Sequence, residues 1–334
     1  MKKANIAVVG ATGVVGRMML KVLEERSFPI DNLYLFASKR SAGKTIAFCG
    51  KDCTVRELTE KSIKNVSVNY ALFSAGGDVS NRYAKAFVSC GGVVIDNSSC
   101  WRMDNSVPLV VPEVNGETAF NNSGIIANPN CSTIQAVVAL KPLHDAFKIK
   151  RIVYSTYQAV SGAGKQGLDD LRNGIDGAPP QKFPHPIAFN VLPHIDVFSD
   201  DGYTKEERKM IVETKKILGD DSIRITATAV RVPVCYGHSE SINIEFHMPV
   251  TREAALKVLH NAPGIVVRDD VQNNLYPMPI EAEGRDEVFV GRIREDKSVE
   301  NGLNIWVVAD NIRKGAATNA VQIAELLHRK TSRT

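Results

Sequence analysis

The stretch that decides the fold is VVGATGVVGRMML, residues 8–20. The apolar run at residues 5–9 predicts a buried strand, and residues 14–26 have the pattern of a helix, with glycines at three-residue spacing between them. Backbone approaches a phosphate closely where no Cβ intrudes, and the helix N-terminus attracts its charge. The stretch therefore predicts a dinucleotide-binding unit, although the glycines could serve only a tight strand-helix turn. The predicted cofactor contacts are Gly10, Thr12, Gly13, Val14, Val15 and Gly16.

The end of the next predicted strand, residues 33–37, indicates which dinucleotide binds. An acidic residue there would hold the ribose 2′-hydroxyl of NAD, whereas an arginine accommodates the 2′-phosphate of NADP. The sequence continues with Ser38, Lys39, Arg40 and Ser41. NADP is therefore predicted, with Ser38, Arg40 and Ser41 at its phosphate; a solvated basic turn is the alternative.

Two kinds of sheet are expected along the chain. Apolar runs that alternate with helical patterns predict a parallel, doubly wound α/β sheet. Later segments alternate apolar and polar residues, which is typical of an antiparallel or mixed sheet. The first set comprises the runs at 70–74, 93–95 and 125–127 with a helix near 79–89; the second comprises 151–160, 222–234 and 241–250.

We therefore expect a Rossmann-like NADP-binding domain and an α+β catalytic and dimerisation domain with a mixed sheet. The first should comprise residues 1–128 and 313–334, because residues 315–329 have the pattern of a helix that can pack back on it. The second should comprise residues 129–312. Its Pro/Gly-rich segment 174–196 is expected to be a long functional or dimer-facing loop.

Composition narrows the class of protein. With 334 residues, 44% hydrophobic and 23% charged, the chain is long enough for two globular domains. Its 41 basic and 37 acidic residues include no long basic run, which gives no support for nucleic-acid or membrane binding. The first apolar run is too short for a signal peptide, and six cysteines make no dense disulfide framework, so a reducing cytoplasm is expected. Cys49 and Cys53 lack a second pair, so no metal site is predicted.

One cysteine lies in a setting that favours reactivity. In ANPNCSTIQA, residues 127–136, Pro129 and Asn130 favour a turn, and an apolar helical run follows. Cys131 should therefore lie at a helix N-terminus, where the helix dipole favours an anion and the thiol loses its proton more readily than in a core. The alternative is a small, half-buried residue at a helix start.

These features together resemble one family, the aspartate-β-semialdehyde dehydrogenases. The resemblance covers nearly the whole chain, and the segment RVPVCYGHSES resembles the branch common in Gram-positive bacteria. It implies NADPH-dependent reductive dephosphorylation of L-4-aspartyl phosphate to L-aspartate 4-semialdehyde with release of phosphate, in lysine, diaminopimelate, threonine, methionine and isoleucine biosynthesis, by a homodimer or homotetramer. The resemblance rests on ten segments, which follow one another along the chain as GATGVVG, SKRSAGK, FSAGG, DNSSCWRMD, VPEVN, NPNCSTIQ, YQAVSGAGKQG, ETKKIL, RVPVCYGHSE and DNIRKGAA.

The resemblance also implies a role for each matching residue. Cys131 matches the nucleophile, His238 the acid/base and Gln158 the residue that orients the acyl group. Arg102 and Lys216 match phosphate-binding positions, although Lys215 is an alternative to Lys216. Glu213 and Arg231 match positions that hold the substrate's amino and carboxylate groups, and Asn130, beside the nucleophile, matches a further substrate-binding position. Ser161, Gly162 and Asn311 match further cofactor contacts.

The residues themselves suit this chemistry. A thiolate displaces phosphate from an acyl phosphate and forms a thioester, which accepts a hydride. His238 follows a predicted turn at Tyr236–Gly237, from which its ring can project into a cleft as a proton shuttle. Arg102, Arg231 and Glu213 could instead be ordinary solvated charges.

Two other functions share some of these features. Reductases of N-acetyl-glutamyl phosphate and dehydrogenases of the glyceraldehyde-3-phosphate type share the cofactor loop and the Cys/His pair, but not NPNCSTIQ together with YQAVSGAG. A non-catalytic NADP-binding paralogue is expected to lose Cys131 or His238, and this chain has both.

Overall fold

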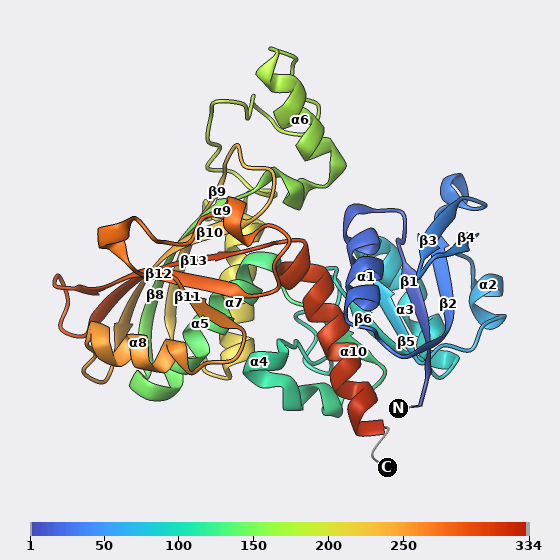
Figure 1. Ribbon diagram of the computed structural model, residues 1–334, viewed down its shortest axis with the longest axis horizontal. Coiled ribbons are helices and arrows are strands. Elements are labelled where there is room, and N and C mark those ends of the chain that lie inside the picture. The colour runs from blue at the N-terminus through green and yellow to red at the C-terminus, as the bar shows by residue number, and fades with distance from the viewer. Residues whose placement is uncertain (1, 332–334) are drawn as a thin grey trace. The chain divides into compact units, whose positions relative to one another are not determined.

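The structure is a computed structural model that describes residues 2–331. The chain forms two units, of which one comprises the chain up to Pro129 together with the segment from Ala316 onward, and the other comprises Asn130 to Gly315. Figure 1 shows that each unit is built on its own sheet.

The sheet of the first unit is the predicted doubly wound one. Its seven strands lie in the order β3-β4-β2-β1-β5-β6-β7. All neighbours pair in parallel except β3 and β4, an antiparallel hairpin that the sequence analysis did not predict. The strands are β1 (Ala4–Val9), β2 (Ile30–Ala37), β3 (Thr45–Phe48), β4 (Lys51–Glu57), β5 (Tyr70–Phe73), β6 (Val93–Asp96) and β7 (Ile125–Ala127).

The C-terminal helix completes the core of this unit, as its apolar pattern predicts. Ile6 and Val8 of β1 share one buried cluster with Val321 and Ala324 of the last helix. In that cluster, residues from the N-terminal strand and the C-terminal helix bury apolar surface against each other, and this burial holds the two ends of the chain in one unit. The helices are α1 (Val14–Glu25), α2 (Glu60–Lys64), α3 (Gly77–Ser89), α4 (Pro112–Asn115) and α10 (Thr318–Thr331).

The second unit contains a six-stranded mixed sheet, in the order β11-β12-β13-β10-β8-β9. The pairs β8/β9 and β11/β12 are parallel and the others are antiparallel, which confirms the predicted mixed sheet. The strands are β8 (Ile149–Gln158), β9 (Arg224–Arg231), β10 (His238–Phe246), β11 (Ile265–Val267), β12 (Val288–Asp296) and β13 (Gly302–Ala309).

Several predicted strand bounds are wrong: the strand expected at 151–160 is Ile149–Gln158, and the one expected from residue 241 begins at His238. The strand expected at 222–234 ends at Arg231, two residues before Pro233, which cannot donate to a ladder. The strand expected at 241–250 ends at Phe246, because the next two N–H groups donate to the carbonyls of Lys148 and Phe147 instead.

Helices cover one face of the mixed sheet. Helix α5 packs against β8, β10, β12 and β13, and α7 packs against β9. On the other face, Tyr157 of β8 is 38% exposed. The helices are α5 (Cys131–Phe147), α6 (Lys165–Ile175), α7 (Lys205–Leu218), α8 (Arg252–His260) and α9 (Pro279–Ala282).

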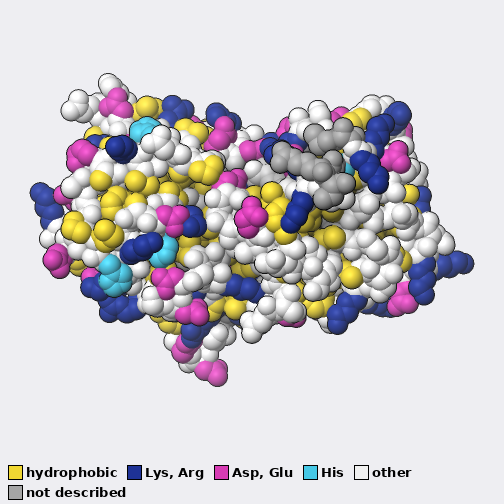
Figure 2. Space-filling view, turned by 90° about the horizontal axis from the view of Figure 1, so that it is seen from below, with side chains coloured by type: hydrophobic (Ala, Val, Ile, Leu, Met, Phe, Trp, Pro, Cys, Tyr) yellow, Lys and Arg dark blue, Asp and Glu magenta, His cyan; other side chains and the backbone are white. Residues whose placement is uncertain are grey.

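Within residues 2–331, no helix is long and apolar enough to cross a membrane. On the face in Figure 2, basic side chains lie scattered among acidic and neutral ones and form no continuous basic area. Over the same described range, no three His, Cys, Asp or Glu side chains gather as a metal site would require.

Candidate active site

Cys131 is the first residue of α5, and Asn130 is the N-cap. The Oδ1 atom of Asn130 accepts hydrogen bonds from the N–H groups of Ser132 (3.0 Å) and Thr133 (3.3 Å). Asn130 thus satisfies two of the N–H groups that a helix start leaves without intrahelical partners. The predicted position of the thiol at a helix N-terminus is therefore confirmed, and the dipole of α5 favours a thiolate there.

His238 faces this thiol from the neighbouring sheet. It is the first residue of β10 and is fully buried, and its Nε2 atom lies 3.2 Å from the sulfur of Cys131. Its Nδ1 atom accepts a hydrogen bond from the backbone N–H of Ala159 at 3.0 Å. Because Nδ1 is the acceptor, a neutral ring carries its proton on Nε2, toward the sulfur.

The electrostatic surroundings of His238 favour this neutral ring. Burial lowers the pKa of the imidazole well below its ordinary value, and the positive charge of Arg231 lowers it further. A neutral His238 ring can therefore donate from Nε2 to a thiolate or to an oxygen that gains negative charge.

Gln158 and Arg231 lie side by side because they are register partners at the ends of the parallel strands β8 and β9. Arg231 is 6% exposed, so it is not a solvated surface charge. Its Nη1 atom donates to the carbonyl of Ala159 at 2.8 Å, and its buried Nε has no hydrogen-bond partner among residues 2–331. A buried guanidinium with an unused donor suits a carboxylate ligand.

Gly162 follows this pair in the loop after β8. A Cβ atom at this position would lie 3.0 Å from Nη1 of Arg231 and 3.5 Å from Cε1 of His238. A side chain here would crowd both residues, so the loop can lie this close to them only because the position is a glycine.

Helix α7 adds two buried carboxylates. Glu213, 1% exposed, accepts a hydrogen bond from the backbone N–H of Asn130 at 2.7 Å, which contradicts the alternative of a solvated helix-face charge. Glu206, 5% exposed, accepts from Nδ2 of Asn130 (2.8 Å) and Nε2 of Gln158 (3.3 Å). The sequence analysis missed Glu206, although its spacing of seven residues from Glu213 is two helical turns and places both on one face.

The two lysines of ETKK point in different directions around α7. Lys216 follows Glu213 by three residues and so lies near its face of the helix. Lys215 lies on another side, where its Nζ donates to the carbonyl of Asp221 at 3.0 Å.

Asn311 and Ser161 hold the turn before His238. Nδ2 of Asn311 donates to the Ser161 hydroxyl at 3.0 Å, while Oδ1 of Asn311 accepts from the N–H of Gly237 at 3.0 Å. Gly237 has a φ of +86°, which favours glycine. Both side chains are buried, so these hydrogen bonds fix the position of the histidine.

The glycine-rich loop of the first unit has the predicted geometry. Gly10 has a φ of +84°, and a Cβ there would lie 2.8 Å from the carbonyl oxygen of Ser74. A Cβ at Gly16 would lie 2.2 Å from the carbonyl oxygen of Gly10, so this glycine allows α1 to start against the loop. The residues of the loop therefore fit a dinucleotide phosphate at the α1 N-terminus, with Thr12, Gly13, Val14 and Val15 at the same turn.

The same unit contains the remaining predicted contacts. Ser38 and Arg40 are exposed in the turn after β2, whereas Ser41 is buried. Arg102 is 7% exposed, and it donates from Nε to the carbonyl of Asn128 and from Nη2 to that of Asn97, both at 2.9 Å. It is therefore a positioned side chain rather than a solvated one.

Comparison with known proteins assigns the family. The model for "Semialdehyde dehydrogenase, NAD binding domain" matches residues 5–122, and the model for "Semialdehyde dehydrogenase, dimerisation domain" matches residues 140–314. The fold is thus that of a semialdehyde dehydrogenase, and the thiol-imidazole pair lies within it.

Individual relatives narrow the class. The chain is 63% identical over 333 residues to an aspartate-semialdehyde dehydrogenase of Aquifex aeolicus and 49% identical over 337 residues to that of Bacillus subtilis, with 97% of each chain covered. A crystal structure of aspartate semialdehyde dehydrogenase II complexed with ASA, from Vibrio cholerae, superposes with a TM-score of 0.94 at 50% identity, covering 98% of this chain and 99% of that one. The chain therefore belongs to the aspartate-semialdehyde dehydrogenase family, as its motifs predict.

Proposed function

We propose that the protein catalyses the NADPH-dependent reductive dephosphorylation of L-4-aspartyl phosphate to L-aspartate 4-semialdehyde and phosphate. The observation that carries the proposal is the 3.2 Å approach of the Cys131 sulfur to Nε2 of His238 at a helix N-terminus, in a member of this family. The relative from Vibrio cholerae that is described as complexed with ASA supports the substrate.

In the first step, the Cys131 thiolate attacks the acyl carbon. A C–S bond forms as the C–O bond to phosphate breaks, and phosphate leaves and takes a proton from solvent. Asn130 holds the N-terminus of α5 against the nucleophile through its bonds to Ser132 and Thr133. The product of this step is a thioester on Cys131.

In the second step, the thioester is reduced. Bound NADPH supplies the hydride. The Nε2–H group of His238 donates its proton to the thioester oxygen as that oxygen gains negative charge. When the C–S bond breaks and the aldehyde carbonyl re-forms, the proton returns to Nε2 and Cys131 leaves as a thiolate.

Substrate recognition is assigned to four charged residues. Arg102 and Lys216 would bind the phosphate; Lys216 is preferred to Lys215 because it lies near the Glu213 face of α7. Arg231 would bind the α-carboxylate through its unused Nε–H, and Glu213 would bind the amino group. Gln158 would orient the acyl group.

NADP is the proposed cofactor, held by residues 10 and 12–16 of the loop and by Ser38, Arg40 and Ser41 after β2. A family model for NAD binding matches this part of the chain, and a solved relative from Candida albicans, 28% identical, contains NADP. The exposed Arg40 favours the 2′-phosphate. Ser161, Gly162 and Asn311 are proposed as further contacts. The first unit would be the NADP-binding domain and the second the catalytic and dimerisation domain, with bounds near 128 and 313.

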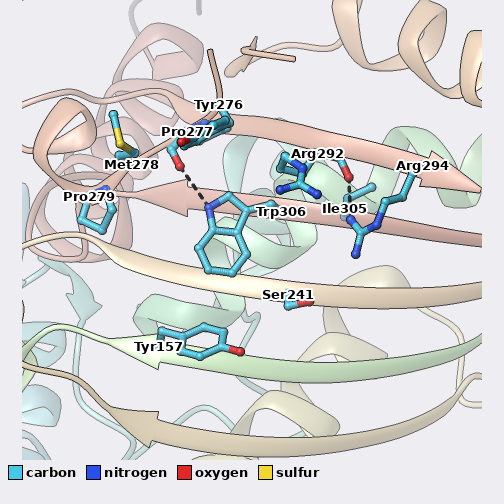
Figure 3. A pocket seen from close by; sticks show the side chains of 10 residues that line it. All are labelled: Tyr157, Ser241, Tyr276, Pro277, Met278, Pro279, Arg292, Arg294, Ile305 and Trp306. Atoms are coloured by element: carbon cyan, nitrogen blue, oxygen red, sulfur yellow. Dashed lines mark hydrogen bonds between the residues drawn. The ribbon is translucent and has the colours of Figure 1, made fainter. Parts of the chain in front are cut away.

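A homodimer or homotetramer is proposed, with a second copy of the chain on the face of the mixed sheet that carries Tyr157, which α9 covers only over β12 and β13. A model of a dimerisation domain matches residues 140–314. A pocket of about 490 Å³ lies on this sheet. Figure 3 shows that Tyr157, Ser241 and Trp306 line it from the neighbouring strands β8, β10 and β13. Aromatic side chains of this kind are enriched at interfaces. A cytoplasmic location is proposed on the low cysteine content.

The reverse reaction tests the function. Purified protein with phosphate, NADP and L-aspartate 4-semialdehyde should generate NADPH, measured by its absorbance, and Cys131→Ala should generate none. N-acetyl-glutamate semialdehyde and glyceraldehyde 3-phosphate serve as comparison substrates. Turnover of either in preference to aspartate semialdehyde, or no turnover at all, would overturn the proposal.

A further inference from the structure

One buried carboxylate connects three elements around the reactive thiol. Glu206 of α7 is 5% exposed, and its Oε1 atom accepts hydrogen bonds from Nδ2 of Asn130 (2.8 Å) and Nε2 of Gln158 (3.3 Å). Its Oε2 atom accepts from Nζ of Lys209 at 3.2 Å. Glu206 therefore connects the N-cap of α5, the end of β8 and its own helix.

We propose that Glu206 is a positioning residue that fixes the orientation of the amide groups of Asn130 and Gln158 beside Cys131. The inference rests on the proposed function, and it specifies which end of its side-chain amide, the oxygen or the NH2 group, Gln158 presents to the substrate.

Asn130 can satisfy its neighbours in one orientation only. Its Oδ1 must face α5 to accept from the N–H groups of Ser132 and Thr133, so its Nδ2 must face Glu206. A flipped amide would place N–H against N–H at the helix start and oxygen against oxygen at Glu206. The carboxylate thus fixes the cap from the side that the helix does not reach.

Gln158 is oriented by the same carboxylate. Its Nε2 donates to Oε1 of Glu206 and to Oγ1 of Thr156, both at 3.3 Å, so both amide hydrogens are directed into the protein. Its Oε1 atom accepts no hydrogen bond from the residues that the structure describes. Gln158 therefore presents an acceptor, so it would orient the acyl group through a donor of the same substrate, its ammonium group, and not through the acyl oxygen, which is itself an acceptor.

The contacts of position 206 require a group that only accepts. The three donors come from two amides and an ammonium, and a carboxylate can accept from all of them. A glutamine has the same shape, but its NH2 group would face either Lys209 or the two amides. One of these contacts would then be donor against donor.

The next residue provides a matched control. Glu207 is also buried, at 7% exposed, but its oxygens accept from the backbone N–H groups of Thr204 (2.7 Å) and Ala229 (2.9 Å). It contacts neither Asn130 nor Gln158. Glu207→Gln therefore removes a buried negative charge from the same helix, as Glu206→Gln does, but it leaves the hydrogen bonds of Asn130 and Gln158 unchanged.

The test measures kcat and KM in the reverse reaction, and the melting temperature, for the full-length Glu206→Gln and Glu207→Gln enzymes. We expect both to melt at lower temperature. In Glu206→Gln, kcat should fall about 10- to 100-fold, because groups at the reacting centre are misplaced. In Glu207→Gln, kcat should stay within about twofold of the unaltered enzyme, because a change remote from the reacting groups leaves transition-state binding intact.

A double-mutant cycle tests the route of the effect. If Glu206 acts largely through Gln158, adding Glu206→Gln to Gln158→Ala should cost less than it costs in the unaltered enzyme. Equal kcat losses in Glu206→Gln and Glu207→Gln, or full additivity with Gln158→Ala, would overturn the positioning role while the proposed function stands. Unaltered enzyme that is inactive on aspartate semialdehyde would overturn both.

Discussion

The backbone N–H of Ala159 donates to Nδ1 of His238 at 3.0 Å, while the carbonyl of Ala159 accepts from Nη1 of Arg231 at 2.8 Å. One residue thus holds the imidazole and the guanidinium. It places the proton of the neutral ring on Nε2, 3.2 Å from the sulfur of Cys131. In this arrangement a neutral His238 can donate to a thiolate, and it can act as a base only after it has given that proton away.

This arrangement can be tested by removing one N–H group. Ala159 has φ −63° and ψ 148°, which suits proline, so Ala159→Pro deletes the donor with little change in backbone angles. The pKa of His238 should rise, because Nδ1 becomes free to take a proton. The acid limb of the pH profile of kcat should then move to higher pH, and kcat should fall about fivefold, the equivalent of one hydrogen bond of ~1 kcal/mol. Ala159→Gly keeps the N–H and is the control; identical pH profiles for all three enzymes would refute the assignment.

Cofactor choice can be tested at the turn after β2. Arg40→Ala should weaken NADPH binding by about 1–3 kcal/mol, typical of a charge-assisted contact, and leave NADH binding nearly unchanged. Only NADPH carries the 2′-phosphate. Dissociation constants from cofactor fluorescence would measure this, with the neighbouring exposed Lys39→Ala as the control. Equal losses for both cofactors would show that Arg40 does not contact that phosphate.

The two buried arginines should divide the substrates between them. In the reverse reaction, Arg102→Ala should raise KM chiefly for inorganic phosphate, and Arg231→Ala chiefly for aspartate semialdehyde. Each ligand brings its own anion, and removing a positioned guanidinium leaves only that anion without its partner. Steady-state kinetics with both substrates varied would decide the matter. The assignment fails if both variants give the same pattern.

Glu240 should make stability depend on pH. It is fully buried, and neither of its carboxylate oxygens has a hydrogen-bond partner within residues 2–331. Burial, and then the charge of Glu206, raise the pKa of its carboxyl well above the ordinary value. The folded state therefore holds a proton that the unfolded chain releases above its own lower pKa.

Stability should consequently fall as pH rises from about 4.5 toward the folded-state pKa, by up to about 1.4 kcal/mol per pH unit from this group. Glu240→Gln cannot titrate, so its melting temperature should fall less than that of the unaltered protein between pH 5 and pH 8. Parallel melting curves across that range would show that Glu240 does not hold the proton.

The features that the sequence predicts well are those that depend on residues close together in the chain. The glycine-rich stretch and the setting of Cys131 depend on neighbours a few residues away, and both appear in the structure as expected. The strands β12 and β13 were not predicted, because arginines and an asparagine interrupt their apolar pattern. For Glu206 the only local signal is its seven-residue spacing from Glu213, because its partners Asn130 and Gln158 lie 76 and 48 positions away and meet it only when α7 packs on the sheet.

The pairing of Gln158 with Arg231 across β8 and β9 has a consequence for how the enzyme gains activity. These residues are 73 positions apart in the sequence and become neighbours only when two parallel strands align in one register. A slip of one position would place Val230 or Val232 opposite Gln158 and direct Arg231 to the other side of the sheet. During refolding, helical signal can return before this alignment is complete, whereas turnover cannot. The reappearance of activity therefore reports the closing of a long-range strand pair, which is intrinsically slow.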